Sequence, residues 1–188
     1  MSKKVLIAYG SRFGSTEEIA RKIGEVIVTE GVESELVDLR KTKKGRWPSP
    51  SNFDGVLVGS GIKIMKWTKE AESFLKVNSD YFKEGGTPLG LFVSCLSRVT
   101  EGEEGGKEYL VKIMETLGIH AVLYEAFGAV LDFSSSSRMD FLNKKMLRMG
   151  MKEASKEKGL VFDENGRNDY REWEQIEEFA KKFVSLIK

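Results

Sequence analysis

A hydroxyl-rich segment near the N-terminus carries the residues best suited to chemistry in this sequence. It follows the apolar run of residues 5–8 and precedes a pattern of apolar residues three or four positions apart, which predicts a helix. The start of a helix exposes free backbone N–H groups and carries about half a positive charge. Glycine allows close approach of the backbone, and hydroxyl groups add donors. We therefore expect a phosphate group to bind at this segment, which consists of Ser11, Arg12, Phe13, Gly14, Ser15 and Thr16.

The spacing of the segment excludes two common phosphate loops. The P-loop has four residues between its glycines and then Gly-Lys-Ser/Thr, whereas three residues separate Gly10 from Gly14 and Ser15 follows. The dinucleotide pattern G-x-G-x-x-G does not fit either. An ordinary helix cap after a strand is the alternative that remains open.

Residues 11–16 resemble the phosphate loop of flavodoxins, which has the approximate pattern T/S-x-T-G-x-T and holds the terminal phosphate of FMN. Ser11, Gly14 and Thr16 match this pattern, and Phe13 stands where a threonine is usual. The resemblance implies that FMN is the cofactor. It also implies that a backbone N–H group or Arg12 replaces the missing threonine hydroxyl.

The elements that position this loop are predicted as short apolar strands separated by helices. Such strands, without strict alternation, are typical of a parallel sheet covered on both faces. The sequence therefore predicts an α/β protein with three layers, α/β/α, and a five-stranded parallel sheet. The resemblance to flavodoxins implies the strand order 2-1-3-4-5. We expect the strands near residues 5–8, 32–39, 55–59, 89–93 and 121–130.

The chain length of 188 residues suits a single flavodoxin-like domain over residues 1–188. Within it we expect an insert and basic helix over residues 131–152 and a closing helix over residues 170–187. The basic helix, from 138 to 152, should pack an inner stripe on the sheet and turn its basic residues outward. The expected stripe consists of Met139, Leu142, Met146 and Met149, and the expected basic face of Lys145, Arg148 and Lys152. Thr68 is expected to cap a helix, and residues 41–52 to form a solvated connection.

Ligands of parallel sheets bind beyond the carboxyl ends of the strands, so we expect three loops to line one pocket. The first is the hydroxyl-rich segment. By the resemblance, the second passes along the flavin ring and includes Ser60, Gly61, Ile62, Lys63, Ile64 and Trp67. The third faces the other side of the ring and includes Ser94, Cys95, Leu96, Ser97 and Arg98.

Within these loops, Trp67, Ile62 and Leu96 are the candidates to cover the ring, with core packing as the alternative for Trp67. The small residue Gly61 is expected to let its peptide group approach the ring. Lys63, Lys66 and Arg98 predict an electropositive site, unless their side chains point outward.

Composition and motifs argue against several classes of function. The net charge of +1 gives no global attraction to nucleic acid or membranes, and basic residues are not interleaved with aromatic ones. The single cysteine excludes an internal disulfide, and we see no metal-ligand cluster and no catalytic acid–base or nucleophile motif. Cys95 and His120 are interpreted as structural. No stretch has the form of a signal peptide or membrane span, so we expect a cytoplasmic protein.

The whole chain also resembles one branch more closely, the flavodoxin-type menaquinone-dependent protoporphyrinogen IX dehydrogenases. The shared features are residues 13–20, the Gly59-Ser60-Gly61-Ile62-Lys63 loop, Gly128-Ala129, the basic helix, and Trp173-Glu174-Gln175 at the start of the last helix. In that branch an aromatic and arginine-rich insert precedes the basic helix. Residues 131–138 are serine-rich instead.

Three functions remain open. The first is an FMN electron carrier that works with redox partner proteins, ferredoxin-like or reductase, and we rank it first because it requires no acid–base residues. The second is an enzyme that oxidises protoporphyrinogen IX with a quinone acceptor. The third is a module that binds a partner without flavin. The basic helix further predicts contact with an anionic membrane surface or an acidic redox partner.

Overall fold

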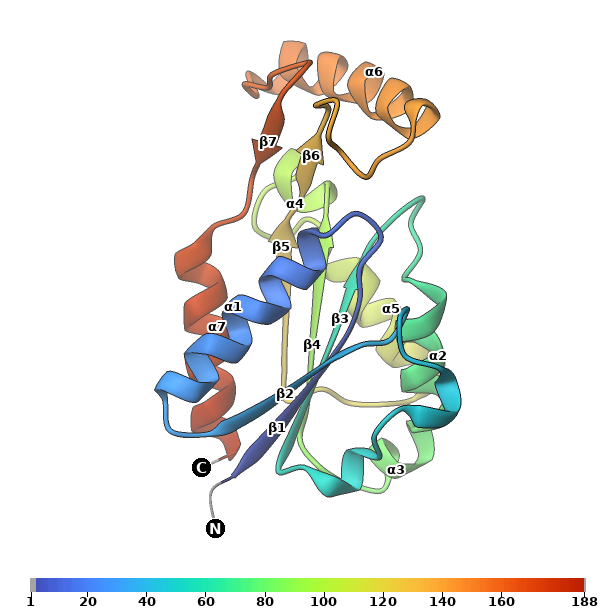
Figure 1. Ribbon diagram of the computed structural model, residues 1–188, viewed down its shortest axis with the longest axis vertical. Coiled ribbons are helices and arrows are strands. Elements are labelled where there is room, and N and C mark those ends of the chain that lie inside the picture. The colour runs from blue at the N-terminus through green and yellow to red at the C-terminus, as the bar shows by residue number, and fades with distance from the viewer. Residues whose placement is uncertain (1–2, 188) are drawn as a thin grey trace.

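The computed structural model describes residues 3–187 and shows a sheet between two layers of helices (Figure 1). Within these residues, five parallel strands are arranged in the order β2-β1-β3-β4-β5. The apolar runs of the central strands are buried because helices cover both faces of the sheet. The predicted fold class and strand order are therefore confirmed. The strands are β1 (Lys4–Gly10), β2 (Glu33–Asp38), β3 (Gly55–Gly61), β4 (Leu89–Cys95) and β5 (Leu123–Gly128).

Helices α1 (Ser15–Thr29) and α7 (Trp173–Ile187) cover one face of the sheet (Figure 1). Their apolar residues recur at helical spacing and pack with Phe92 and Phe127 in one core. A second core on the other face lies under α2 (Lys69–Val77), α3 (Ser79–Lys83) and α5 (Lys107–Leu117). The remaining short helices are η1 (Lys44–Arg46), η2 (Pro50–Asn52) and α4 (Ser97–Thr100).

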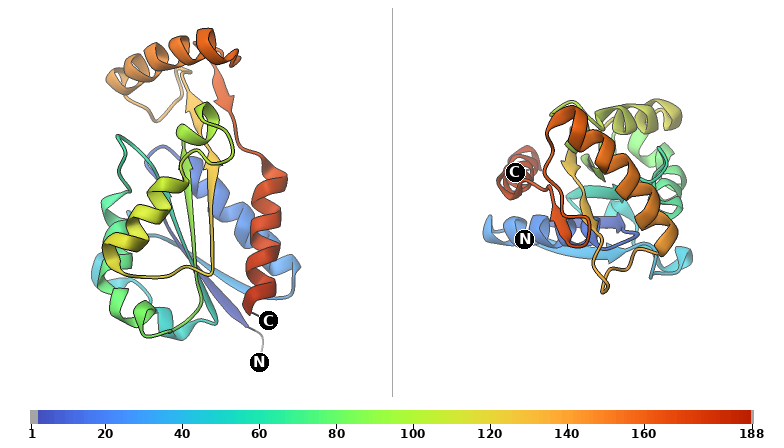
Figure 2. Two further views of the ribbon diagram at one scale, coloured as in Figure 1. Left: turned by 180° about the vertical axis from the view of Figure 1, so that it is seen from behind. Right: turned by 90° about the horizontal axis from the view of Figure 1, so that it is seen from above.

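Beyond the carboxyl end of the sheet lies a small additional unit that contains the expected insert and basic helix, together with a pair of strands that the sequence patterns did not predict (Figure 2). Strands β6 (Val130–Asp132) and β7 (Arg167–Asp169) pair antiparallel, and α6 (Phe141–Lys158) connects them. The expected strand over 121–130 instead spans Leu123–Gly128. A Cβ on Gly128 would lie 2.0 Å from the carbonyl oxygen of Tyr170, so glycine allows the returning chain to come close here. The backbone N–H of Tyr170 in turn donates to the carbonyl oxygen of Ala129, 3.1 Å away.

The basic helix is shifted relative to the expected 138–152. It begins at Phe141 because the Asp140 carboxylate accepts from the backbone N–H of Asn143 at 2.9 Å and so caps the helix. It continues to Lys158 and ends before Gly159, which has a positive φ of 67°. The closing helix likewise starts at Trp173 and not at residue 170.

The expected inward stripe is wrong for three of its four residues, whereas Met139, which precedes α6, is buried. Leu142, Met146 and Met149 are 65%, 55% and 65% exposed. The contacts of α6 are made instead by Leu147 and Met151, which pack with a separate cluster that includes Phe133 of the insert. The reason is that α6 lies on the narrow β6–β7 pair and not on the sheet (Figure 2).

Two of the expected outward basic residues face this same unit. The guanidinium of Arg148 lies 5.2 Å from the centre of the Phe133 ring, and Lys152 pairs with Glu164 at 2.7 Å. Arg148 also donates from Nε to the carbonyl oxygen of Glu164 at 2.9 Å. Basic residues of α6 therefore help to hold the helix on the β6–β7 unit.

Two smaller expectations are also revised. Trp47 is half-buried and packs edge-on against Phe74, 5.8 Å between ring centres, so residues 41–52 are not wholly solvated. Thr68 precedes α2 as expected, but its hydroxyl lies 3.2 Å from the hydroxyl of Ser60 and does not cap the helix. Among the described residues, no helix combines the length and the apolarity that a membrane crossing requires.

Candidate functional site

The register of the sheet brings the three predicted loops to one edge. Gly10 pairs with Ser60, and Gly61 pairs with Ser94, so β1, β3 and β4 end side by side. Residues from all three following loops line one cavity of about 290 Å³. The convergence of the loops on a common pocket is therefore as expected from the sheet topology.

The first loop leaves the start of α1 open toward this cavity. Gly14 has a φ of 107°, which favours glycine, and within the described residues no side chain caps the helix. The backbone N–H of Gly14 donates to the hydroxyl of Ser11 at 3.0 Å, and the hydroxyls of Ser15 and Ser94 lie 2.9 Å apart. The N–H groups of the first helical turn are thus available to an anion, and Ser11, Ser15 and Thr16 lie beside them.

Arg12 lines the cavity, but its guanidinium serves the second loop. It donates to the carbonyl oxygen of Gly61 and, at 2.8 Å, to that of Trp67. Burial and the neighbouring Arg40 lower the pKa of Arg12. The side chain therefore fixes the position of residues 61–67.

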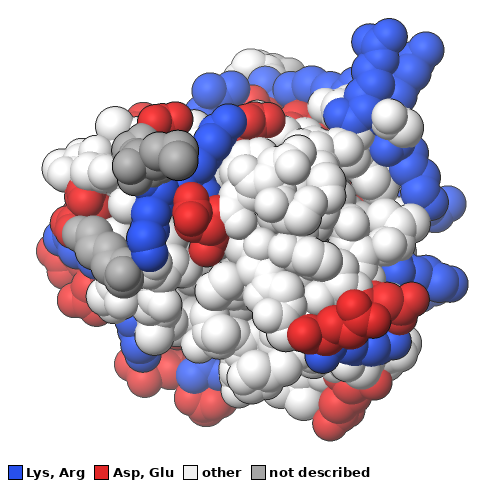
Figure 3. All heavy atoms as spheres, turned by 90° about the horizontal axis from the view of Figure 1, so that it is seen from below, with Lys and Arg blue, Asp and Glu red and all other residues white. Residues whose placement is uncertain are grey.

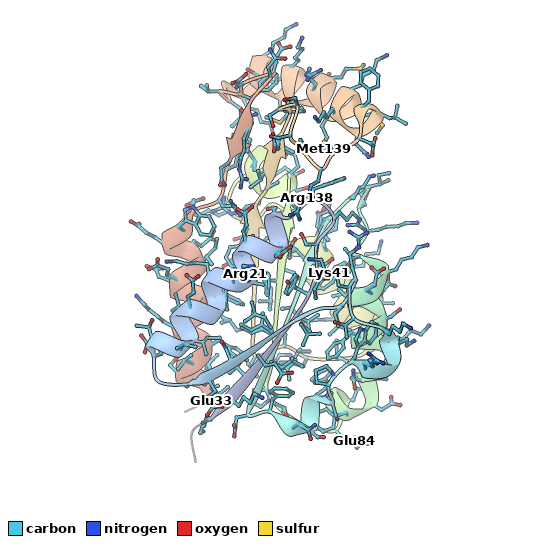
Figure 4. The ribbon with its side chains drawn as sticks, in the orientation of Figure 1. Arg21, Glu33, Lys41, Glu84, Arg138 and Met139 are labelled. Atoms are coloured by element: carbon cyan, nitrogen blue, oxygen red, sulfur yellow. The ribbon has the colours of Figure 1, made fainter. Side chains whose placement is uncertain are left out.

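Arg138 is a cation that lies near the hydroxyl-rich loop, and the sequence reasoning did not place it there. Its Nη1 atom lies 3.8 Å from the carboxylate of Glu17 and 3.5 Å from the position of a Cβ on Gly14. Figure 4 shows Arg138 over the N-terminal end of α1. The side chain comes from the insert, far away in sequence, and nothing in its local pattern pointed to this loop.

The far part of the cavity is apolar. Ile62 and Leu96 line it from the second and third loops, as expected, and Met139 lies beneath α6 (Figure 4). A Cβ on Gly61 would lie 3.1 Å from the hydroxyl oxygen of Thr16, so glycine allows the end of β3 to lie close to the start of α1. The lining residues that the sequence reasoning missed are Met65, Tyr109, Ala129, Val130, Leu131, Met139, Asn143, Met146 and Leu147.

Four of the predicted site residues do not line the cavity. Trp67 is 6% exposed and donates from its indole N–H to the carbonyl oxygen of Tyr109 at 3.1 Å, so it packs in the core. The hydroxyl of Ser60 accepts from the backbone N–H of Thr68 at 2.8 Å and holds the start of α2. Arg98 pairs with Glu172 at 2.9 Å, away from the cavity. Gly14 is buried and contributes through its backbone conformation.

The charge of the site is smaller than the sequence suggests. Lys63 lines the cavity with its ammonium 5.7 Å from the centre of the Phe13 ring, whereas Lys66 is exposed and absent from the lining. Burial raises the pKa of Cys95 to about 11, so the thiol stays protonated at neutral pH. Its interpretation as a structural residue is consistent with this environment. Among the described residues, no group of three His, Cys, Asp or Glu side chains could hold a metal ion.

Arginines from β7 and its end bind the first turn of α1. Arg171 is buried and donates to the carboxylates of Glu18, at 2.7 Å, and Asp169. Arg167 pairs with Glu18 at 2.8 Å. Burial alone would raise the pKa of both carboxyl groups, but the hydrogen bonds from these arginines hold each pKa below its ordinary value. The additional unit is therefore tied to α1, the helix whose start is open toward the cavity.

An open helix start at the carboxyl edge of a 2-1-3-4-5 sheet, next to a largely apolar cavity, defines a class of α/β proteins that hold a phosphate-bearing aromatic ligand there. Comparison with known families gives the same class. The chain belongs to the flavodoxin domain family, which matches residues 6–160. Flavodoxins are FMN-binding redox proteins.

Individual relatives are distant. Protoporphyrinogen IX dehydrogenase [quinone] of Escherichia coli (strain K12) is 21% identical over 97% of this chain and 96% of its own length. Oxidised flavodoxin 1 of Bacillus cereus aligns with a TM-score of 0.56 and 19% identity over 97% of both chains. The rubredoxin oxygen:oxidoreductase of Desulfovibrio gigas has a TM-score of 0.57 and 16% identity, over 98% of this chain and 36% of that longer chain. These structures share the fold.

Proposed function

We propose that this protein binds FMN in the described cavity and passes electrons between partner proteins through it. The observation that carries the proposal is the meeting of an open helix start with an apolar cavity lined by three loops. The phosphate is assigned to the first turn of α1, with Ser11, Ser15, Thr16 and Arg138 beside it. The ring is assigned to the space between residues 61–65 and residues 94–97.

When bound, FMN supplies one-electron and two-electron redox chemistry. The residues of the chain bind and orient it: backbone N–H groups hold the phosphate, and Ile62 and Leu96 provide apolar contact. Arg12 fixes residues 61–67 by its bonds to the carbonyl oxygens of Gly61 and Trp67. Asn143, Met146 and Leu147 of α6 line one side of the cavity and would restrict the access of water to the ring from that side.

A titration of the purified protein with FMN, compared with riboflavin, tests the phosphate assignment. FMN should bind with a change in its visible absorption and about 100-fold more tightly than riboflavin, because two charge-assisted hydrogen bonds contribute about 3 kcal/mol. Arg138→Gln should reduce only the FMN affinity, while Arg21→Gln, on the exposed side of α1, should leave it unchanged. Equal affinities for FMN and riboflavin would contradict the assignment.

A second candidate is the oxidation of protoporphyrinogen IX with a quinone acceptor. It is favoured by one observation, the extension of the cavity under Met139, Asn143, Met146 and Leu147, which gives more apolar lining than the three loops provide. The Escherichia coli relative carries this activity in its name. Steady-state oxidation of protoporphyrinogen with a soluble menaquinone analogue would support this candidate. Electron exchange with a ferredoxin-like or reductase protein, without porphyrin turnover, would support the carrier.

We further propose that the protein works in the cytoplasm. The support is its single cysteine, which is buried and unpaired among the described residues, as is usual in a reducing compartment. Fractionation of cells that express the chain would test this location. Recovery in an oxidising compartment would contradict it.

A further inference from the structure

Large apolar side chains are exposed on both sides of the cavity mouth. On one side, the turn after β3 carries Ile64 and Met65, which are 72% and 70% exposed and line the cavity. This turn rises toward the N-terminal end of α6 (Figure 1). On the other side, the first half of α6 presents exposed apolar residues. We call this set the apolar rim; it consists of Ile64, Met65, Phe141, Leu142, Met146 and Met149.

The turn that contains Ile64 and Met65 has a backbone conformation that these two residue types do not favour. Lys63 and Lys66 exchange two backbone hydrogen bonds of 3.1 Å, and the two residues between them have positive φ angles of 49° and 58°. Such two-residue turns favour Asn-Gly, because a β-branched residue is strained at positive φ. Ile64 and Met65 adopt this conformation without gaining burial in the fold. A local rule broken without a packing gain is typical of a functional site.

The apolar rim is accompanied by positive charge. Helix α6 contains six basic and two acidic residues, a net charge of +4, although the whole chain has a net charge of +1. Its first twelve residues, 141–152, contain four basic residues and no acidic one, and two of the four, Arg148 and Lys152, bond Glu164 of the β6–β7 unit. Lys63 and Lys66 add two cations at the turn. At the opposite end of the molecule, acidic and basic side chains alternate around an uncharged centre (Figure 3).

We propose that the apolar rim, together with Lys66 and Lys145, docks this protein on an anionic membrane surface. Exposed Phe, Leu, Ile and Met side chains next to Lys and Arg are the composition that inserts at the level of lipid headgroups. A second copy of the chain fits less well, because a two-fold contact through this face would bring Lys66 and Lys145 near cations of the same kind. The docked orientation turns the mouth of the cavity toward the lipid and allows an apolar electron acceptor to enter from it.

This proposal adds a partner to the proposed redox function and can fail independently of it. The test is flotation of the full chain with vesicles of phosphatidylglycerol and phosphatidylcholine, compared with vesicles of phosphatidylcholine alone. We expect at least tenfold stronger partition to the anionic vesicles, reduced at least fivefold when the salt concentration rises from about 0.1 M to 0.5 M.

The decisive variant is Leu142→Gln with Met149→Gln, because neither residue lines the cavity and Gln is a good helix former. It should lose at least tenfold in partition, and FMN titration should show an unchanged affinity. Ile64→Asn with Met65→Gly, which suits the turn, should lose partition as well. The matched control is Val28→Ser, since Val28 is 57% exposed on α1 far from the rim.

Three outcomes would overturn the proposal: no flotation of the unchanged protein, equal flotation of the double Gln variant, or a dimer in sedimentation that this variant abolishes while vesicles bind neither protein. If the unchanged protein did not bind FMN, that result would contradict the proposed function. The flotation result would still decide whether the apolar rim binds anionic vesicles.

Discussion

Arg171 is a single residue that joins two distant parts of the chain. Its side chain is 1% exposed and lies 4.3 Å from the centre of the Trp173 ring. Its guanidinium donates to Glu18, to Asp169 and, at 3.3 Å, to the carbonyl oxygen of Ser15. The last of these is a residue of the proposed phosphate loop. A buried arginine of this kind is costly to desolvate, and its partners offset that cost only as a complete set.

Arg171→Met is therefore expected to lower the free energy of unfolding by about 2 kcal/mol at pH 7, a value reduced by the partial exposure of both carboxylates. Arg167→Gln, at the exposed pair, should cost less than about 1 kcal/mol. Urea denaturation at pH 7 measures both. A larger loss for Arg167→Gln than for Arg171→Met would contradict the central position of Arg171.

The same residues predict a pH dependence. The pKa values of Glu18 and Asp169 lie below their ordinary values of 4.5 and 3.8, so both groups bind protons less readily in the folded state. Their contribution to stability is complete above about pH 5 and is lost as the pH falls through the lower, folded pKa values. The difference in unfolding free energy between the unchanged protein and Arg171→Met should therefore shrink from pH 7 to pH 3. A constant difference would contradict this.

Cys95 makes a prediction about reactivity. With a pKa raised to about 11 by burial, the thiol should react with iodoacetamide at pH 8 on the order of 100-fold more slowly than an exposed cysteine. Measuring the same reaction in urea, where the chain is unfolded, provides the control. Fast alkylation of the folded protein would show that the cavity wall opens at this point.

At the scale of elements, α6 is held less firmly than the helices on the sheet. Its apolar anchors are Leu147 and Met151 in a small cluster, whereas α1 buries apolar residues along its whole length. Few buried contacts imply a low free energy of local opening. The roof of the cavity is therefore the part of the described chain in which we expect opening to admit a ligand.

Hydrogen exchange tests this difference. The amides in the middle of α6 should exchange about 100-fold faster than those in the middle of α1. Met151→Ala should remove about 3 kcal/mol of packing from the small cluster and accelerate exchange in α6 without affecting α1. Met149→Ala, at a side chain 65% exposed, is the matched control and should change neither helix. Equal protection of α6 and α1 would contradict the local opening.

The central strands of the sheet could be predicted from sequence because β1, β3 and β4 are buried apolar runs followed by a glycine or serine. The three loops that follow β1, β3 and β4 were found for the same reason. The β6–β7 pair could not be predicted, since three-residue strands leave no periodic pattern. The orientation of α6 was wrong because its apolar residues occupy two faces, and the periodicity of one face does not say which neighbour it meets.

Within the site, the errors also have local causes. Trp67 was a candidate ring cover from its position after β3, but its indole N–H finds a backbone acceptor on α5 and the ring enters the core. Met139, Asn143 and Met146 were missed as lining because they reach the cavity only through the position of the additional unit. Contacts set by the docking of separate units do not follow from spacing along the chain.

At the scale of the whole molecule, the sheet depends on close contact between glycines and aromatic rings on its faces. A Cβ on Gly59 would lie 2.1 Å from the ring of Phe92, and one on Gly90 would lie 3.0 Å from the ring of Phe183. Phe92 itself packs with Phe127 and Phe179, 6.1 and 6.2 Å between ring centres. The packing of α7 against the sheet therefore depends on the glycine at position 59, which leaves room for the ring of Phe92.

Gly59→Ala should consequently lower the free energy of unfolding by about 3 kcal/mol, because the added methyl group overfills the space under Phe92. Thermal unfolding followed by circular dichroism measures the change. Gly45→Ala, where nothing lies within 4 Å of the new Cβ, is the control and should shift the midpoint little. A Gly59→Ala protein with unchanged midpoint would show that the ring can move aside.

The backbone contact between Tyr170 and Ala129 has a consequence for the architecture as a whole. The chain leaves the sheet and returns to it at neighbouring points, joined by one hydrogen bond of 3.1 Å. Residues 130–169 are therefore an excursion that a short linker could bypass, leaving the five-stranded body and α7 connected in their present path. The same junction would accept the corresponding segment of another protein. Replacing residues 130–169 in this way should change the ligand preference while the five-stranded sheet stays the same.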